Sequence, residues 1–139
     1  MSARRKTSPR RDRELIAAAA RARAGAYVPY SNYRVGAAVL TSDGDVHTGA
    51  NVENASYGLS VCAERVAIFA AVAGGHRAID TVAVVTDDGG PPCGACRQVM
   101  AEFGVRRVII GSPRGRPVVR TLKQLLPHAF LPDRLLGRK

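Results

Sequence analysis

The chain has 139 residues, of which 46% are apolar and 23% are charged, so its composition excludes wholesale disorder and a fibrous repeat. No apolar stretch approaches the roughly 18 residues that a membrane-spanning helix needs, and we therefore expect a soluble, cytoplasmic protein with no membrane partner. The formal net charge of +10 is strongly basic and raises the question of an acidic partner.

Half of the excess positive charge lies in residues 1–13, which contain six Arg or Lys residues and one Asp. We interpret this segment as a disordered basic arm that precedes a single domain over residues 14–139. Clustered arginines could instead contact nucleic acid by releasing counterions from phosphate, or the segment could be an organellar transit peptide. Because no aromatic residue alternates with these charges to stack on a base, we expect a solvated tail and no nucleic-acid partner.

The predicted elements alternate between helices and strands along the chain. An amphipathic helix over residues 14–26 comes first, and a Ser-Asp-Gly turn then joins strands over 35–40 and 46–51 as a hairpin. The remaining predicted elements are a helix over 62–73, a strand over 82–86, a helix over 94–103, strands over 105–110 and 117–120, and a short helix over 122–126. This order predicts an α/β fold, a three-layer α/β/α sandwich in which helices cover both faces of a mixed five-stranded sheet.

The connection between the last two predicted strands fixes their relative direction. Only seven residues lie between Ile110 and Val118. A parallel crossover connection needs about a dozen residues or more, and usually contains a helix. We therefore expect the last two strands to be antiparallel.

The three cysteines, Cys62, Cys93 and Cys96, belong to the pattern that carries chemistry. The groups Cys62-Ala63-Glu64-Arg65 and Pro92-Cys93-Gly94-Ala95-Cys96 each lie at the predicted start of a helix, where unpaired N–H groups and the helix dipole favour thiolate. Cys93 and Cys96 lie about one helical turn apart, so both can face one ion, and Cys62 would add a third ligand. Three protein ligands leave one position of tetrahedral zinc open for water, which is typical of a catalytic zinc site.

Two neighbours of Cys62 could complete such a site. Zinc lowers the pKa of a bound water, and Glu64 could then move protons. Arg65 could donate hydrogen bonds to the sulfurs and offset the excess negative charge of three thiolates. Cys93 and Cys96 alone could instead be a redox pair. A structural site of three cysteines and one histidine could recruit one of the chain's three histidines, which are His47, His76 and His128.

The combination of C-x-E and P-C-x-x-C resembles the cytidine deaminase family of small zinc enzymes, with Cys62 where the H-x-E signature has histidine. The resemblance extends over nearly all of the chain from residue 14 onward. It includes the segments Ala26-Tyr27-Val28-Pro29-Tyr30-Ser31, Val35-Gly36-Ala37-Ala38, Gly49-Ala50-Asn51-Val52-Glu53-Asn54-Ala55-Ser56-Tyr57-Gly58 and Cys93-Gly94-Ala95-Cys96-Arg97-Gln98. It implies a cytidine deaminase-like fold, one Zn²⁺ per subunit, and hydrolytic deamination of cytidine and 2′-deoxycytidine to uridine and 2′-deoxyuridine, with release of ammonia, in pyrimidine salvage.

The resemblance also implies roles for individual residues. The three cysteines match the zinc ligands, Glu64 matches the proton shuttle, and Arg65 matches a residue that hydrogen-bonds the ligand thiolates. Asn51 and Glu53 match residues that hold the ribose hydroxyls. Ala55 lies where members of the family use the backbone to hold the base.

Two aromatic residues belong to the same comparison. Tyr33 lies where the family usually has a base-stacking Phe, so the aromatic face is kept and a hydroxyl is added. Phe130 resembles an aromatic residue that a neighbouring subunit contributes to the site. The resemblance therefore implies a homotetramer in which Phe130 reaches a neighbouring site.

Three other functions share parts of the pattern. A deaminase of RNA or DNA fits the basic charge, but in the family such enzymes have a helix between their last two strands, and residues 111–117 leave no room for one. A blasticidin-type deaminase shares the zinc motif, whereas Asn51-Val52-Glu53-Asn54 resembles the nucleoside branch. A zinc-stabilised binding module without catalysis would contact nucleic acid through the basic arm.

Overall fold

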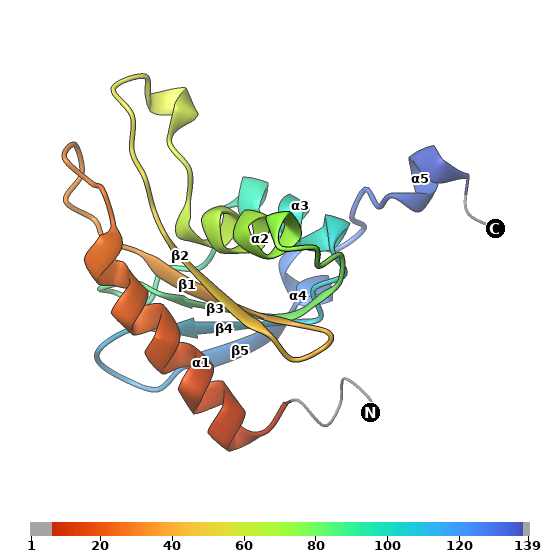
Figure 1. Cartoon of the computed structure of the whole chain (residues 1–139), viewed down its shortest axis with the longest axis horizontal. Coiled ribbons are helices and arrows are strands. Elements are labelled where there is room, and N and C mark those ends of the chain that lie inside the picture. Colours follow the sequence, from red (N-terminus) through yellow and green to blue (C-terminus); the bar gives the residue numbers. More distant parts are fainter. Residues whose placement is uncertain (1–6, 138–139) are drawn as a thin grey trace.

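The computed structural model describes residues 7–137. One mixed β-sheet forms the middle layer of this structure (Figure 1). Its strands are β1 (Gly36–Thr41), β2 (Val46–Ala50), β3 (Ile79–Val85), β4 (Arg107–Gly111) and β5 (Val118–Thr121). The spatial order is β2-β1-β3-β4-β5, in which β3 and β4 are parallel and the other neighbouring strands are antiparallel. The predicted five-stranded mixed sheet is confirmed, and so is the antiparallel pairing of its last two strands.

Helices cover both faces of the sheet, as predicted for a three-layer sandwich. The helices are α1 (Pro9–Ala22), α2 (Ala63–Ala73), α3 (Gly94–Glu102), α4 (Leu122–Leu125) and α5 (Asp133–Leu136). Figure 1 shows α1 on one face and α2 with α3 on the other. Within residues 7–137, none of the helices combines the length and the apolar character that crossing a membrane requires.

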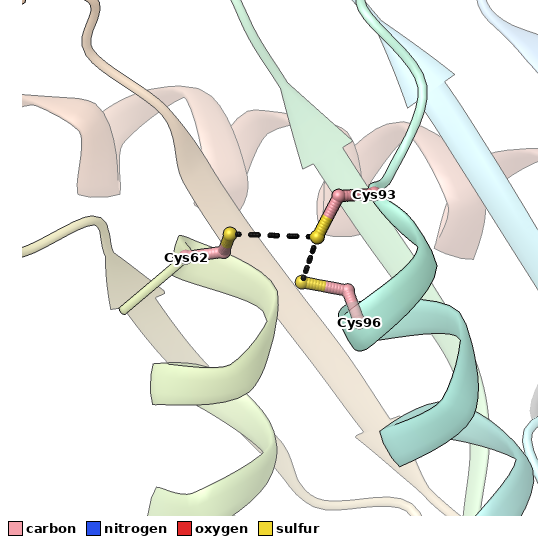
Figure 2. A group of neighbouring side chains, drawn as sticks. All are labelled: Cys62, Cys93 and Cys96. Atoms are coloured by element: carbon pink, nitrogen blue, oxygen red, sulfur yellow. Dashed lines mark hydrogen bonds between the residues drawn. The ribbon is translucent and has the colours of Figure 1, made fainter. Parts of the chain in front are cut away.

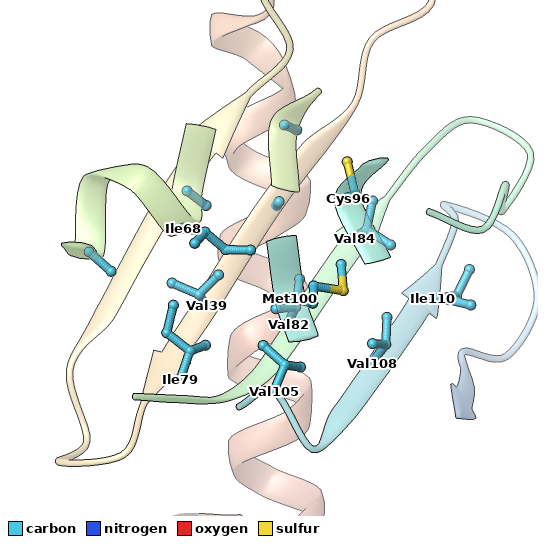
Figure 3. Close-up of a cluster of buried hydrophobic side chains, with 14 residues drawn as sticks. Val39, Ile68, Ile79, Val82, Val84, Cys96, Met100, Val105, Val108 and Ile110 are labelled. Atoms are coloured by element: carbon cyan, nitrogen blue, oxygen red, sulfur yellow. The ribbon is translucent and has the colours of Figure 1, made fainter. Parts of the chain in front are cut away.

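The alternation of side chains along the buried strands divides the core between the two faces. On β1, Val39 packs in the cluster that faces α2 and α3, whereas the next residue, Leu40, packs in the cluster that faces α1. The larger cluster contains Ile68 of α2 and Met100 of α3, and Cys96 belongs to it as well (Figure 3). The cysteine on α3 is thus held by the packed core.

The first helix begins five residues earlier than predicted. Ser8 is its N-cap and accepts a hydrogen bond from the Arg11 N–H at 3.1 Å, and proline at the first helical position is favourable. Asp12 forms an ion pair with Arg107 of β4, with a shortest distance of 2.7 Å, which ties this turn to the sheet. Assigning residues 9–13 to a disordered arm was therefore wrong, whereas residues 1–6 of the predicted arm lie outside the described residues.

Two glycines allow helices to approach the sheet closely. A Cβ atom at Gly49 of β2 would lie 2.5 Å from the Ala67 nitrogen and 2.9 Å from the Ala63 oxygen of α2. A Cβ at Gly36 would lie 2.0 Å from the Ala19 oxygen of α1. Because only glycine lacks this atom, Gly49 sets the position of the first turns of α2, where the candidate site begins.

Candidate metal and active site

Helices α2 and α3 bring the three cysteines together at their N-termini (Figure 2). Cys62 is the N-cap of α2, Cys93 is the N-cap of α3, and Cys96 lies in the first turns of α3. The Sγ atoms of Cys62 and Cys93 are 3.8 Å apart, and those of Cys93 and Cys96 are 3.6 Å apart. Cys93 is exposed whereas Cys96 is buried, so the cluster is anchored in the core and opens toward the surface.

This arrangement fits a zinc ion. In tetrahedral zinc with Zn–S bonds of about 2.3 Å, neighbouring sulfurs lie about 3.8 Å apart, which is close to both measured separations. Three sulfurs leave one coordination position open. Within residues 7–137, no histidine belongs to the cysteine cluster. His47 and His76 group instead with Asp45. The structure therefore does not place these two histidines in a site of three cysteines and one histidine.

Hydrogen bonds polarise the cysteine cluster. The Nη2 atom of Arg65 donates to the Cys62 Sγ at 3.5 Å. Donation from Cys96 and from Arg65 lowers the pKa of the Cys62 thiol to about 5. The pKa of Cys96 is raised in turn, because it donates to Cys62 and because it is buried. Metal binding removes thiol protons, so the positive charge of Arg65 beside the cluster favours the metal-bound form.

Glu64 lies next to this cluster in the first turn of α2, and only 4% of its surface is exposed. Burial disfavours the carboxylate and, together with the nearby Cys62 charge, raises the pKa of Glu64 to about 7. A carboxyl group with such a pKa can both accept and donate a proton near neutral pH. The side chain is therefore suited to proton transfer beside the metal position.

Asn51 and Glu53 fasten the loop that precedes β1. The Asn51 Nδ2 donates to the Tyr33 carbonyl at 2.9 Å, and its Oδ1 accepts from the Val35 N–H at 2.9 Å. The Glu53 carboxylate accepts from the backbone N–H groups of Tyr30 and Ser31 at 3.0 and 3.2 Å, and from the Ser31 hydroxyl. These hydrogen bonds lower the pKa of Glu53, with the Ser31 hydroxyl as the largest cause. Both side chains thus have a structural task that their positions in the sequence did not indicate.

Tyr33 is fixed by a partner that sequence reasoning missed. Its hydroxyl donates to the Asp88 carboxylate at 2.7 Å, and Asp88 also accepts from the Thr86 hydroxyl at 3.2 Å. Asp88 lies in the loop that leads from β3 to Cys93, so this contact joins Tyr33 to the segment that positions the cysteines on α3. The turn-forming sequence around Asp88 predicted a loop but gave no signal for the pairing with Tyr33.

The two remaining predicted substrate residues, Ala55 and Phe130, are exposed. Ala55 lies in the long loop between β2 and α2. Phe130 lies in the segment between α4 and α5, where its carbonyl accepts from the Gln98 Nε2 at 2.8 Å. The neighbouring Arg97 donates to the carbonyls of Pro92 and Leu125, both at 2.8 Å. Residues that directly follow the last cysteine therefore anchor the C-terminal segment, a role that sequence reasoning also missed.

Comparison with known proteins connects this geometry to a family. The family described as "Cytidine and deoxycytidylate deaminase zinc-binding region" matches residues 9–112. The chain is 53% identical over 120 residues to a cytidine deaminase of Halalkalibacterium halodurans, an alignment that covers 84% of this chain and 91% of that protein. It is 49% identical over 121 residues to a cytidine deaminase of Sporosarcina psychrophila, covering 84% of this chain and 89% of the relative.

A solved structure gives the same result. The cytidine deaminase of Burkholderia pseudomallei superposes with a TM-score of 0.80 at 52% sequence identity, covering 85% of this chain and 98% of that chain. The matches first establish the class, a deaminase of a family described as zinc-binding, which removes an amino group by hydrolysis. More narrowly, the chain belongs to the cytidine deaminase family.

Proposed function

We propose that this enzyme deaminates cytidine and 2′-deoxycytidine to uridine and 2′-deoxyuridine with release of ammonia, as a step of pyrimidine salvage in the cytoplasm. We further propose that each subunit binds one Zn²⁺ through Cys62, Cys93 and Cys96. The observation that carries the proposal is the position of buried Glu64 directly beside three cysteines whose measured sulfur separations of 3.8 and 3.6 Å suit tetrahedral zinc.

The bound zinc would supply a water of lowered pKa as the nucleophile. Glu64 takes a proton from the attacking water and delivers it to N3 of the cytosine ring, while the oxygen adds to C4. Glu64 then takes the remaining proton of the oxygen added at C4 and passes it to the amino group, so that the C4 carbonyl forms as the C4–N4 bond breaks and ammonia leaves. Arg65 keeps its guanidinium on the Cys62 sulfur throughout and so holds a ligand in place.

The sugar would be recognised by the hydrogen-bonding capacity that Asn51 and Glu53 still have. A carboxylate can accept about four hydrogen bonds, and three on Glu53 are already used, which leaves one for a sugar hydroxyl. The Asn51 amide similarly has one N–H beyond the one that bonds Tyr33. The negative charge of Glu53 would repel a phosphate on the sugar, so the proposal favours free nucleosides over nucleotides.

The base would stack on Tyr33 and contact the backbone at Ala55. Tyr33 suits this role because its hydroxyl is held by Asp88 while the side chain stays 38% exposed. Phe130, which is 58% exposed, would extend into the site of a neighbouring subunit in a homotetramer. An exposed phenylalanine whose backbone is anchored by Gln98 is suited to such a contact.

The proposal is tested by incubating zinc-loaded protein separately with cytidine, 2′-deoxycytidine and cytidine monophosphate, and by identifying products chromatographically. We expect uridine or deoxyuridine and ammonia in equal amounts from the nucleosides, and much slower turnover of the nucleotide. Glu53→Gln should narrow the difference between nucleoside and nucleotide, because it removes the repelling charge. Failure of folded, zinc-loaded protein to convert either nucleoside would overturn the proposal.

A further inference from the structure

We propose that Asp45, His47 and His76 form a second site for a divalent ion of the zinc type, at the opposite end of α2 from the cysteines. Asp45 directly precedes β2, His47 lies on β2, and His76 lies in the loop that joins α2 to β3. One ligand atom from each of the three side chains lies within 4.8 Å of the other two. The proposal does not depend on the proposed function, because it concerns different residues.

The distances suit a metal with nitrogen and oxygen ligands. The Nε2 atom of His76 lies 3.2 Å from the Oδ2 of Asp45. Ligand atoms about 2.0–2.2 Å from a tetrahedral zinc ion lie about 3.3–3.6 Å from one another, so this pair already has nearly the required separation. The rings of His47 and His76 are 5.1 Å apart between centroids, with an interplanar angle of 65°. A ring nitrogen of His47 lies within 4.8 Å of the ligand atoms of Asp45 and His76.

A second carboxylate orients the His76 ring for metal binding. The Oδ1 of Asp43 lies 3.2 Å from the Nδ1 of His76, and it also accepts from the Thr41 hydroxyl at 2.6 Å. With Asp43 on Nδ1, the ring is held so that its Nε2 atom faces the Asp45 carboxylate. A carboxylate that holds the far nitrogen of a metal-bound histidine is a recurrent arrangement in zinc sites.

The surrounding backbone holds the ligands in one place. The Ser42 N–H donates to the Ala78 carbonyl at 3.0 Å, which joins the turn between β1 and β2 to the residues that follow His76. The His76 N–H donates to the Ala71 carbonyl of α2 at 3.0 Å. The His47 ring lies against the end of α2, because a Cβ at Gly74 would be 3.4 Å from its Cε1. An ion bound here would link two loops that are distant in sequence.

The cluster is open to an entering ion but not freely mobile. The Asp45 side chain is 65% exposed, whereas that of His76 is 15% exposed. Two imidazoles and one carboxylate favour zinc and similar transition metals over calcium or magnesium, which prefer oxygen ligands alone. Helix α2 has 11 residues and is therefore about 16 Å long. Because the two clusters lie at its opposite ends, one ion cannot be shared between them.

The test uses protein that already holds zinc at the cysteines, to which further Zn²⁺ is added. The chain has three histidines, so the imidazole resonances of His47, His76 and His128 can be assigned separately by NMR. We expect the first two to shift saturably while that of His128 stays in place. Zinc content after dialysis at fixed free Zn²⁺ should rise by a second ion per chain.

Variants separate this site from adventitious binding. His47→Gln and His76→Gln should each abolish the second ion and keep the first, which shows that the variant is folded, whereas His128→Gln should retain both. Asp43→Ala should weaken the second ion by about 10–100-fold. Unchanged His47 and His76 resonances in wild type would overturn the proposal, as would a second ion that survives both histidine substitutions.

Discussion

The close contact between β2 and α2 makes a quantitative prediction at Gly49. In Gly49→Ala, the new Cβ would lie 2.5 Å from the Ala67 nitrogen, inside α2 backbone that cannot rotate away. The helix must therefore move away by about 0.5–1 Å to restore an ordinary contact distance. Such overpacking destabilises a protein by about 1–3 kcal/mol. Alanine also restricts the unfolded chain, which stabilises the folded state by about 0.4–1 kcal/mol. The free energy of unfolding should therefore fall by about 1–2 kcal/mol.

Thermal unfolding measures this loss. At roughly 3–4 °C per kcal/mol for a chain of this size, the melting temperature of Gly49→Ala should fall by about 3–8 °C at equal protein concentration. The shift also displaces Cys62 and Glu64, which lie on the same turn of α2, so zinc affinity should fall together with stability. Gly25→Ala is the matched control, because a Cβ there meets nothing within 4 Å. A Gly49→Ala protein with the melting temperature of wild type would refute the close contact between β2 and α2.

Three further substitutions test other contacts. Arg65→Gln removes the guanidinium that donates to the cysteine cluster, so zinc affinity measured by chelator competition should fall about 10–100-fold, and unchanged affinity would contradict that role. Tyr33→Phe loses the hydrogen bond to Asp88 and should lower the free energy of unfolding, measured in urea, by about 0.5–1.5 kcal/mol. Tyr33→Ala also loses the ring and should in addition raise the KM for cytidine. An unaltered KM would count against stacking of the base on Tyr33. A double-mutant cycle of Asp12→Asn and Arg107→Gln should give a coupling energy of about 1 kcal/mol, whereas a value near zero would show that the pair does not hold α1 on the sheet.

Local patterns in the sequence were sufficient for most of the fold. Alternating and continuous apolar runs predicted the five strands, and the short connection 111–117 predicted that β4 and β5 are antiparallel. The positions of Cys62 and Cys93 at helix starts followed from the same local reasoning. These features depend on neighbouring residues, which is why one sequence was enough to predict them.

Features that depend on distant partners were missed. Strand β3 begins at Ile79 although polar Asp80 interrupts its apolar run, because the Asp80 carboxylate is buried against Arg106 at 3.0 Å. Helix α1 begins at Pro9 although its first turns are basic; Ser8 caps it locally, and the ion pair of Asp12 with Arg107 of β4 fixes these turns to the sheet. In both places a long-range ion pair stabilises a segment whose local composition did not predict regular structure.

The same limit applies to the candidate site. The C-x-E and P-C-x-x-C motifs located the cysteines and Glu64, because their spacing is local. The pairing of Tyr33 with Asp88 and the meeting of Asp45 with His76 join residues that are far apart in the chain. Only the packed sheet and helices bring such partners together.

Whether Glu64 transfers the protons of the reaction is decided by the kcat of cytidine deamination by Glu64→Gln, compared with wild type at equal zinc content per chain. The amide cannot transfer the protons that the proposed reaction requires, so we expect kcat to fall by about 100-fold to 10,000-fold. Glu102→Gln, which changes an exposed residue at the end of α3, should retain wild-type turnover. A Glu64→Gln enzyme that keeps kcat within tenfold of wild type would contradict proton transfer by Glu64.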